Sequence, residues 1–215
     1  SHWLLGINAF LNNTVRELTE EIDIQERETG GSVKVGRRII ELLRGSLTYR
    51  ISKTETSSES FFLEKLRPDG VKSSAIFTLS RNSTNNYIDP TEGSELSLSQ
   101  GFTGGPILGG DFQFMETVFS SDYYLPIDFT EAFPTYFHFH GQANYIYPMG
   151  GEPVPINERY RLGGYNDMRG YDFNEIGPKV YILQNPGGAR SRFNRGGDKK
   201  LLLQLEYFMP LIPEA

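Results

Sequence analysis

The sequence lacks three features, and each absence excludes a class of protein or site. It has no cysteine, which excludes disulfide frameworks, thiolate metal sites and cysteine nucleophiles. No apolar run approaches the ~20 residues that a membrane-spanning helix requires, so a helical membrane protein is excluded. Basic residues are in the minority, since 21 Lys and Arg stand against 27 Asp and Glu and give a net charge of −6. Nucleic acid is therefore not an expected partner, because phosphate neutralisation needs clustered Lys and Arg.

Short segments in which apolar and polar residues alternate are abundant. In residues 43–51 the odd positions are apolar or glycine and the even ones are polar, and residues 136–147 repeat this with Phe137 and Phe139 against His138 and His140. A period of two is typical of a strand with one apolar face. We expect about eight strands, near residues 3–11, 32–39, 43–51, 75–80, 95–102, 112–125, 136–147 and 201–207.

These strands predict an all-β fold, an antiparallel transmembrane β-barrel formed by a single domain over residues 1–215. The negative mean hydropathy does not contradict this, because only every second strand residue meets lipid. A soluble β-sandwich or barrel also alternates, but apolar, aromatic faces without charge favour lipid contact. The side chains expected to face lipid are Leu47, Tyr49, Phe137, Phe139, Tyr145, Leu203 and Leu205.

The connections between the expected strands alternate in length, as they do in outer-membrane barrels. Short turns are expected near residues 40–41, 85–92 and 126–134, and both chain ends then lie on the periplasmic side. Long loops are expected over residues 12–31, 53–72 and 148–200, with 103–110 on the same side. The acidic residues between 17 and 28 would then form a solvated face of the first long loop.

The connection over residues 148–200 is long enough to signal a function. Gly163, Gly164 and Gly170 permit backbone conformations that are closed to other residues. Aromatic side chains nearby offer surface to bury, namely Tyr165, Tyr171 and Phe173. We therefore expect a loop that is held in one place rather than a disordered segment.

Three motifs in this loop resemble the outer-membrane β-barrel assembly factor superfamily, the BamA-like proteins. They are Arg161-Leu-Gly163-Gly164, then Met168-Arg169-Gly170-Tyr171 in place of the family's Val-Arg-Gly-Phe/Tyr, then Asn174-Glu-Ile-Gly177-Pro178-Lys179. Asp89–Ser94 is similar to a periplasmic turn of the family, and Leu203–Pro210 to the strand that follows its internal loop. The resemblance spans the whole chain and implies the middle part of a sixteen-stranded barrel.

The resemblance implies a factor that folds and inserts β-barrel proteins into the cell outer membrane of a diderm bacterium, or less commonly of an organelle. It implies no chemical step and no cofactor. The implied partners are unfolded outer-membrane proteins, outer-membrane lipids and lipopolysaccharide, and periplasmic accessory subunits. A two-partner secretion or related translocation pore is an alternative within the superfamily, and a small outer-membrane barrel enzyme is an alternative of another class.

Arg169 is the sharpest candidate residue, because a charged side chain folded back into a barrel is costly unless it is paired. Glu206 lies on the polar face of the strand that follows the loop, and the family's arginine contacts an acidic residue at the matching position. We therefore expect Arg169 to lie within hydrogen-bonding distance of Glu206 inside the barrel. The expected role of this pair is to hold the loop in place.

The sequence gives little support for catalysis or metal binding. Gly-x-Ser-x-Gly is absent, and paired catalytic carboxylates cannot be identified. His138 and His140 lie on one face of a strand, but no further ligands with metal spacing are apparent, so hydrogen bonding in the lumen is the expected role. Arg44 and Arg50 are expected to pair with inward carboxylates such as Glu95.

Overall fold

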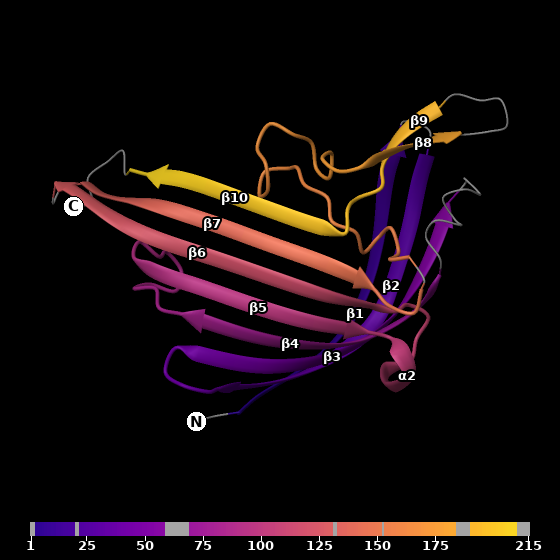
Figure 1. The fold of residues 1–215 in the computed structure, drawn as a ribbon, viewed down its shortest axis with the longest axis horizontal. Helices are drawn as coiled ribbons and strands as arrows, with labels where there is room; N and C mark the ends of the chain where they lie inside the picture. Colours follow the sequence, from indigo (N-terminus) through magenta and orange to yellow (C-terminus); the bar gives the residue numbers. More distant parts are fainter. Residues whose placement is uncertain are drawn as a thin grey trace.

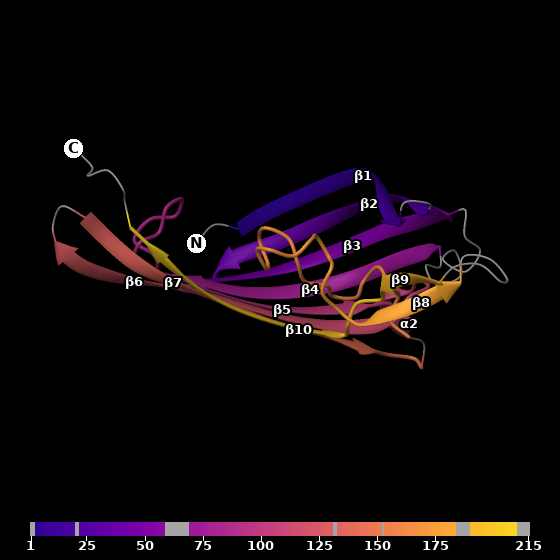
Figure 2. The ribbon, with the colours of Figure 1, turned by 90° about the horizontal axis from the view of Figure 1, so that it is seen from above.

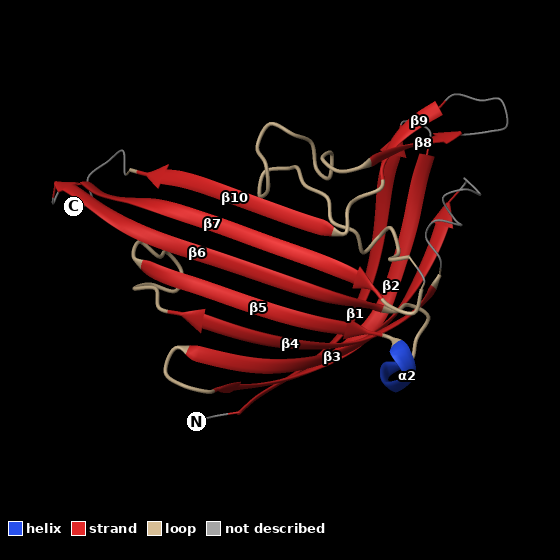
Figure 3. Cartoon of the chain, in the orientation of Figure 1, coloured by secondary structure: helices blue, strands red, loops and turns tan. Residues whose placement is uncertain are grey.

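The structure is a computed structural model that describes residues 3–19, 22–58, 69–130, 133–151, 153–183 and 190–209. Within these ranges the chain consists of strands and loops with a single short helix, which confirms the all-β prediction (Figure 3). The elements are β1 (Trp3–Thr19), β2 (Ile22–Arg38), β3 (Leu43–Ser58), β4 (Gly70–Asn82), β5 (Gly93–Thr103), α2 (Gly105–Leu108), β6 (Phe114–Thr130), β7 (Phe133–Pro148), β8 (Lys179–Leu183), β9 (Arg190–Asn194) and β10 (Lys199–Phe208). No helix in the described ranges has the length and apolar character to cross a membrane.

Eight of the strands form one antiparallel sheet in the order β1-β2-β3-β4-β5-β6-β7-β10. Each strand pairs with the next one along the chain until β7, whose partner is β10, and β8 and β9 form a separate hairpin. The sheet is curved, and the connection between β7 and β10 lies on its concave side (Figures 1 and 2). We call the side that carries this connection the inner face and the opposite side the outer face.

The alternation in the sequence separates these two faces. Directly paired residues of antiparallel strands share a face, so the pairs Leu47↔Phe77 and Phe139↔Leu205 place apolar side chains together on the outer face. The seven predicted lipid-facing residues all lie there, and all are exposed except Phe137, which is half-buried with its ring 5.1 Å from that of Tyr207. The inner face carries mostly Ser, Thr, Asn, Gln, His and charged residues.

Two predicted connections were wrong because the strands are longer than their apolar segments. β1 and β2 remain paired over residues 12–19, with a register shift between Glu17 and Thr19, so the loop expected over 12–31 is a hairpin whose described ends are Thr19 and Ile22. β6 and β7 likewise extend to Thr130 and Phe133, inside the turn expected over 126–134. Backbone pairing continues where side chains become polar, because the ladder depends on N–H and C=O groups and not on lipid contact.

Two other connections have structure that the sequence did not predict. The one expected over 148–200 runs between Pro148 and Lys199 and contains the β8–β9 hairpin. Residues 103–110 include the single turn α2. The loop expected over 53–72 is shortened by β3 and β4, and residues 59–68 lie outside the described ranges.

A small apolar core lies on the inner face, where the connection after β7 begins. Phe114 of β6, Ile146 of β7 and Val154 are buried against one another, with Tyr160 packed beside them. Ile156 and Leu202 are also buried. The beginning of the connection is therefore fixed on the sheet by burial of apolar side chains, which is the largest favourable contribution to folding.

Candidate functional site

The candidate site is the segment 153–178, which we call the anchored loop, together with the inner-face side chains that hold it. Its contacts extend across the curved sheet from β2 to β10. Asn157 Nδ2 lies 3.5 Å from Glu26 Oε1 of β2, and Lys72 Nζ of β4 lies 2.7 Å from Glu158 Oε2. At the other edge, Arg169 Nη2 lies 2.8 Å from Glu206 Oε1 of β10.

Arg169 and Glu206 are thus brought together as the sequence suggested, but their surroundings differ from the expectation. The Arg169 side chain is 65% exposed and that of Glu206 is 31% exposed. Exposed ion pairs contribute about 0.2–1 kcal/mol, so this pair orients the loop more than it stabilises the fold. The guanidinium also lies 5.1 Å from the ring centroid of Tyr165, a distance suited to a cation–π contact.

Next to this pair, β10 holds the loop through two more side chains that the sequence analysis missed. Gln204 Nε2 donates to the backbone carbonyl of Asp167 at 2.6 Å, and Lys200 Nζ lies 3.2 Å from the Asp167 carboxylate. The sequence pattern places three even-numbered residues of β10 on the same face of the strand, namely Lys200, Gln204 and Glu206, so their shared face could be predicted. The loop residues that they contact could not be predicted, because the loop has no repeating pattern that indicates where its side chains point.

Near the start of the anchored loop, Tyr160 donates a hydrogen bond to the Glu116 carboxylate of β6. Burial of the phenol is the larger cause, and its hydrogen bond to Glu116 the second, of a Tyr160 pKa well above the ordinary tyrosine value. The phenol therefore stays protonated at neutral pH and remains a donor. This contact fixes the loop next to the apolar core around Phe114 and Ile146.

The first loop motif is held by hydrogen bonds within the connection itself. Arg161 Nε donates to the carbonyl of Asn194 at 3.0 Å, and its Nη2 donates to the carbonyl of Ile156 at the same distance. Gly163 follows with a φ of +120°, and a Cβ there would lie 2.3 Å from the carbonyl oxygen of Asp172. Only glycine fits this position without strain.

The remaining motif residues shape the turn that presents Arg169. Gly164 and Met168 form a bridge, and the Gly164 N–H donates to the Tyr171 carbonyl at 3.1 Å. Gly170 also has a positive φ, of +91°. Gly177 packs against the side chain of Asn194, and the Pro178 carbonyl accepts from the Arg195 N–H at 2.8 Å.

The expectation that the loop aromatics are buried was wrong for this chain. Tyr165 is 77% exposed and Phe173 is 81% exposed, and Tyr171 is exposed as well. The apolar contacts of the loop are instead made at its beginning, by Val154 and Ile156. Aromatic content alone therefore did not predict which part of the loop packs on the sheet.

His138 and His140 of β7 point to the inner face, as expected, but the expectation that no carboxylate accompanies them was wrong. Asp122 of β6 lies opposite His140 in the strand register, and its Oδ1 lies 2.9 Å from His138 Nε2 and 2.7 Å from His140 Nδ1. Glu206 Oε2 lies 3.6 Å from the other ring nitrogen of His138. The missing signal was the pairing register of β6 with β7, which a single strand pattern does not contain.

Arg50 has an inner-face carboxylate partner, but not the one that was named. Its Nη2 lies 2.9 Å from Glu28 Oε1, across the β2–β3 pair. Glu28 was assigned to a loop in the sequence analysis, and its position on β2 follows from the longer hairpin. The residues of the acidic segment whose side chains are described, Glu26 and Glu28, thus belong to a strand.

Comparison with known proteins gives consistent similarities. The sequence matches the Omp85 superfamily domain over residues 1–215. It is 23% identical over 196 residues to the outer membrane protein assembly factor BamA of Nitratidesulfovibrio vulgaris, covering 89% of this chain and 23% of that protein. It is 29% identical over 120 residues to the human sorting and assembly machinery component 50 homolog, covering 56% of this chain and 24% of that protein. The chain therefore spans about a quarter of the length of these curated relatives.

The fold is also similar to a solved structure. The crystal structure of BamA from Haemophilus ducreyi lacking POTRA domains 1–3 superimposes with a TM-score of 0.78 at 22% sequence identity. The match covers 95% of this chain and 41% of that one. The eight-stranded curved sheet is thus similar to part of a larger barrel structure.

Proposed function

This chain belongs to the Omp85 superfamily, and we propose that it forms part of the barrel of a factor that folds and inserts β-barrel proteins into the outer membrane. The observation that carries the proposal is the anchored loop, held across the inner face of an eight-stranded sheet from β2 to β10. Similarity to an outer membrane protein assembly factor of a bacterium and to a human sorting and assembly machinery component supports this proposal.

The proposed location is the outer membrane of a diderm bacterium, with the outer face of the sheet in contact with lipid. Apolar and aromatic side chains that alternate with polar inner-face residues support this orientation. The proposed lipid-facing side chains are Leu47, Tyr49, Phe137, Phe139, Tyr145, Leu203 and Leu205. Lipopolysaccharide and periplasmic accessory subunits are the proposed partners besides the unfolded substrates.

The proposed mechanism needs no cofactor and no chemical step. An incoming unfolded chain is accepted by pairing with the exposed edge of a strand, because main-chain hydrogen bonds provide affinity for any sequence. The anchored loop stiffens the wall of the barrel while such an edge is open. Glu206 is the partner of Arg169 on the barrel wall. The residues proposed to shape the loop are Arg161, Gly163, Gly164, Met168, Arg169, Gly170, Tyr171, Gly177 and Pro178.

The proposal is tested by reversing the charges of the Arg169–Glu206 pair in the full-length protein. Arg169→Glu brings two carboxylates together, and we expect insertion of an unfolded barrel substrate into proteoliposomes to slow about fivefold, the effect of ~1 kcal/mol. The double variant Arg169→Glu/Glu206→Arg should recover most of the rate. Arg192→Glu, on the exposed surface of β9, is the matched control and should leave the rate unchanged.

Two results would contradict the proposal. One is a wild-type protein that does not accelerate substrate insertion but releases a secreted substrate across the vesicle membrane, which indicates a translocation pore. The other is an Arg169→Glu variant that inserts substrate at the wild-type rate, which shows that the contact of the anchored loop with Glu206 is not required for insertion.

A further inference from the structure

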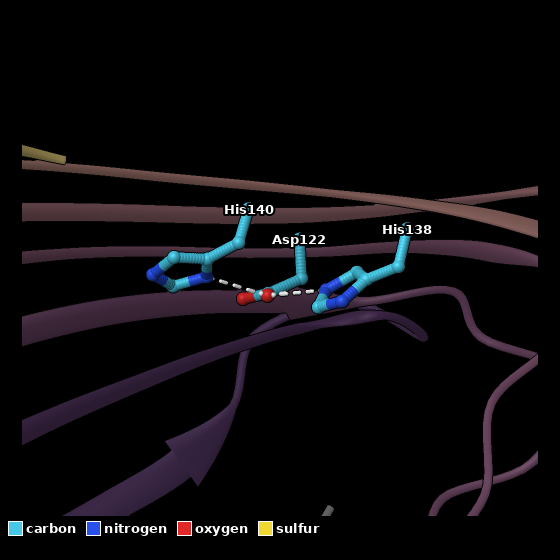
Figure 4. Close-up of side chains that lie close together, drawn as sticks. All are labelled: Asp122, His138 and His140. Carbon is cyan, nitrogen blue, oxygen red and sulfur yellow. Dashed lines mark hydrogen bonds and ion pairs between the residues drawn. The ribbon is translucent and has the colours of Figure 1, made fainter. Parts of the chain in front are cut away.

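The histidine and aspartate side chains on the inner face of β6 and β7 converge on one point (Figure 4). One ring nitrogen of each histidine and one Asp122 carboxylate oxygen all lie within 4.8 Å of one another. All three residues are partly covered, with side-chain exposures of 16%, 23% and 22% for His138, His140 and Asp122. They come from two directly paired strands, so the backbone ladder fixes their relative positions.

This donor set suits a divalent transition-metal ion. Imidazole nitrogens bind zinc, copper, nickel and iron, and two imidazoles with one carboxylate are a common set of three protein ligands. Around a tetrahedral zinc ion with bonds of about 2.0–2.1 Å, neighbouring ligand atoms lie about 3.4 Å apart. Asp122 Oδ1 now lies 2.7–2.9 Å from the two histidine nitrogens, so a widening of several tenths of an ångström accommodates the ion.

The surroundings of His138 favour the same chemistry. Glu206 Oε2 lies 3.6 Å from His138 Nδ1, slightly beyond hydrogen-bonding distance, on the side of the ring away from Asp122. A histidine that binds a metal through one nitrogen commonly donates its other N–H to a carboxylate, which fixes the tautomer and the ring orientation. The ring of Tyr124 stacks on the His138 ring at a centroid distance of 4.5 Å and an interplanar angle of 2°, which further restricts its rotation.

We propose that Asp122, His138 and His140 form a binding site for a divalent first-row transition-metal ion such as zinc. Glu206 is a positioning residue that orients His138. Three protein ligands leave a fourth position for water on the inner face. Because Glu206 also forms an ion pair with Arg169, the same carboxylate lies beside His138 and beside the anchored loop.

The site is tested with the full-length protein, purified in detergent without a histidine tag and treated with a chelator. Cobalt(II) serves as the spectroscopic probe and zinc as the calorimetric one, both at pH 7.5. We expect one ion per chain with a dissociation constant of about 10 µM or lower, which corresponds to roughly −7 kcal/mol. Cobalt bound by nitrogen ligands should give visible absorption that zinc removes.

Variants assign the ion to these residues. His140→Gln and Asp122→Asn should each weaken binding by at least about tenfold, and Glu206→Gln should weaken it by about tenfold while the stoichiometry is kept. Gln142→Ala is the matched control, because Gln142 is the next inner-face residue of β7 after His140. It should bind as the wild type does. Heat-modifiable migration on gels establishes whether each variant is folded. If one of Asp122→Asn and His140→Gln does not fold, the other still tests the site.

The proposal is overturned if the folded wild-type protein shows no saturable binding of zinc or cobalt at one ion per chain. It is equally overturned if a folded Asp122→Asn or His140→Gln variant binds as tightly as the Gln142→Ala control. In either case the three side chains form a hydrogen-bonded cluster only. These outcomes do not depend on substrate insertion, so they are separable from a failure of the proposed function.

Discussion

Gly163 is the position in the anchored loop where a single methyl group has the clearest predicted effect. An alanine there would adopt a left-handed backbone at φ +120° and place its Cβ 2.3 Å from the Asp172 carbonyl oxygen. We expect Gly163→Ala to destabilise the loop conformation by about 1–3 kcal/mol. Limited proteolysis of the full-length protein in detergent should therefore cut the loop faster in the variant.

Gly170→Ala is the control for this substitution. Gly170 also has a positive φ, of +91°, but a Cβ there meets no atom within 4 Å. The difference between the two variants therefore measures the steric conflict with Asp172. Equal cleavage rates would show that the loop does not maintain the close contact between Gly163 and Asp172.

At the residue scale, the sequence identified some contacts of the site and missed others for a physical reason. Glu206 could be named because strand phase gives the face of a side chain, and the Arg-Gly motif gave its partner. The cluster of Asp122 with His138 and His140 could not be named, because it depends on which residue of β6 lies opposite β7. Registry arises from pairing over the whole strand, and one strand's sequence does not contain it.

At the scale of the elements, period-two patterning located all eight strands of the sheet but not their full lengths. The apolar part of β1 ends near Leu11, yet β1 continues to Thr19 by pairing with β2. The β8–β9 hairpin was missed because it has only five residues in each strand and no clear alternation. Apolar alternation therefore marks where a strand meets lipid or a core, and backbone pairing decides where it ends.

Adjacent residues of β3 test which face of the sheet meets lipid. Leu47 is exposed on the outer face, and Thr48 points to the inner face. We expect Leu47→Arg to lower the free energy of unfolding in lipid vesicles by about 2–4 kcal/mol near the membrane midplane. Thr48→Arg should change it much less, because its guanidinium faces the polar interior.

The measurement is a denaturant titration of the full-length protein in vesicles, with tryptophan fluorescence as the signal. A penalty near zero for Leu47→Arg would favour a soluble all-β fold over a transmembrane barrel. A penalty that is equal for both variants would indicate that β3 is buried on both faces.

At the scale of the whole molecule, the main sheet is open within the described residues, with β1 and β10 as its two edges. An unpaired edge in the hydrocarbon region leaves backbone groups unsatisfied, at a cost of several kcal/mol each. The edges must therefore be covered, either by each other or by further strands. The anchored loop occupies the inner face between them, and eight strands closed into a barrel leave an interior only wide enough for side chains. We therefore expect strands outside this chain to cover both edges.

Disulfide trapping distinguishes these two arrangements, and residues 1–215 contain no cysteine that would compete with the introduced pair. Leu203→Cys in β10 is combined in turn with Leu5→Cys, Ile7→Cys or Ala9→Cys on the same face of β1, in the full-length protein in membranes. We expect no intramolecular cross-link from any of the three. The double variant Phe139→Cys/Leu205→Cys, whose residues are direct partners across β7 and β10, should cross-link and so shows that the conditions are adequate. An efficient bond between Leu203→Cys and any of the β1 positions would mean that the two edges meet, and the barrel would then close with eight strands.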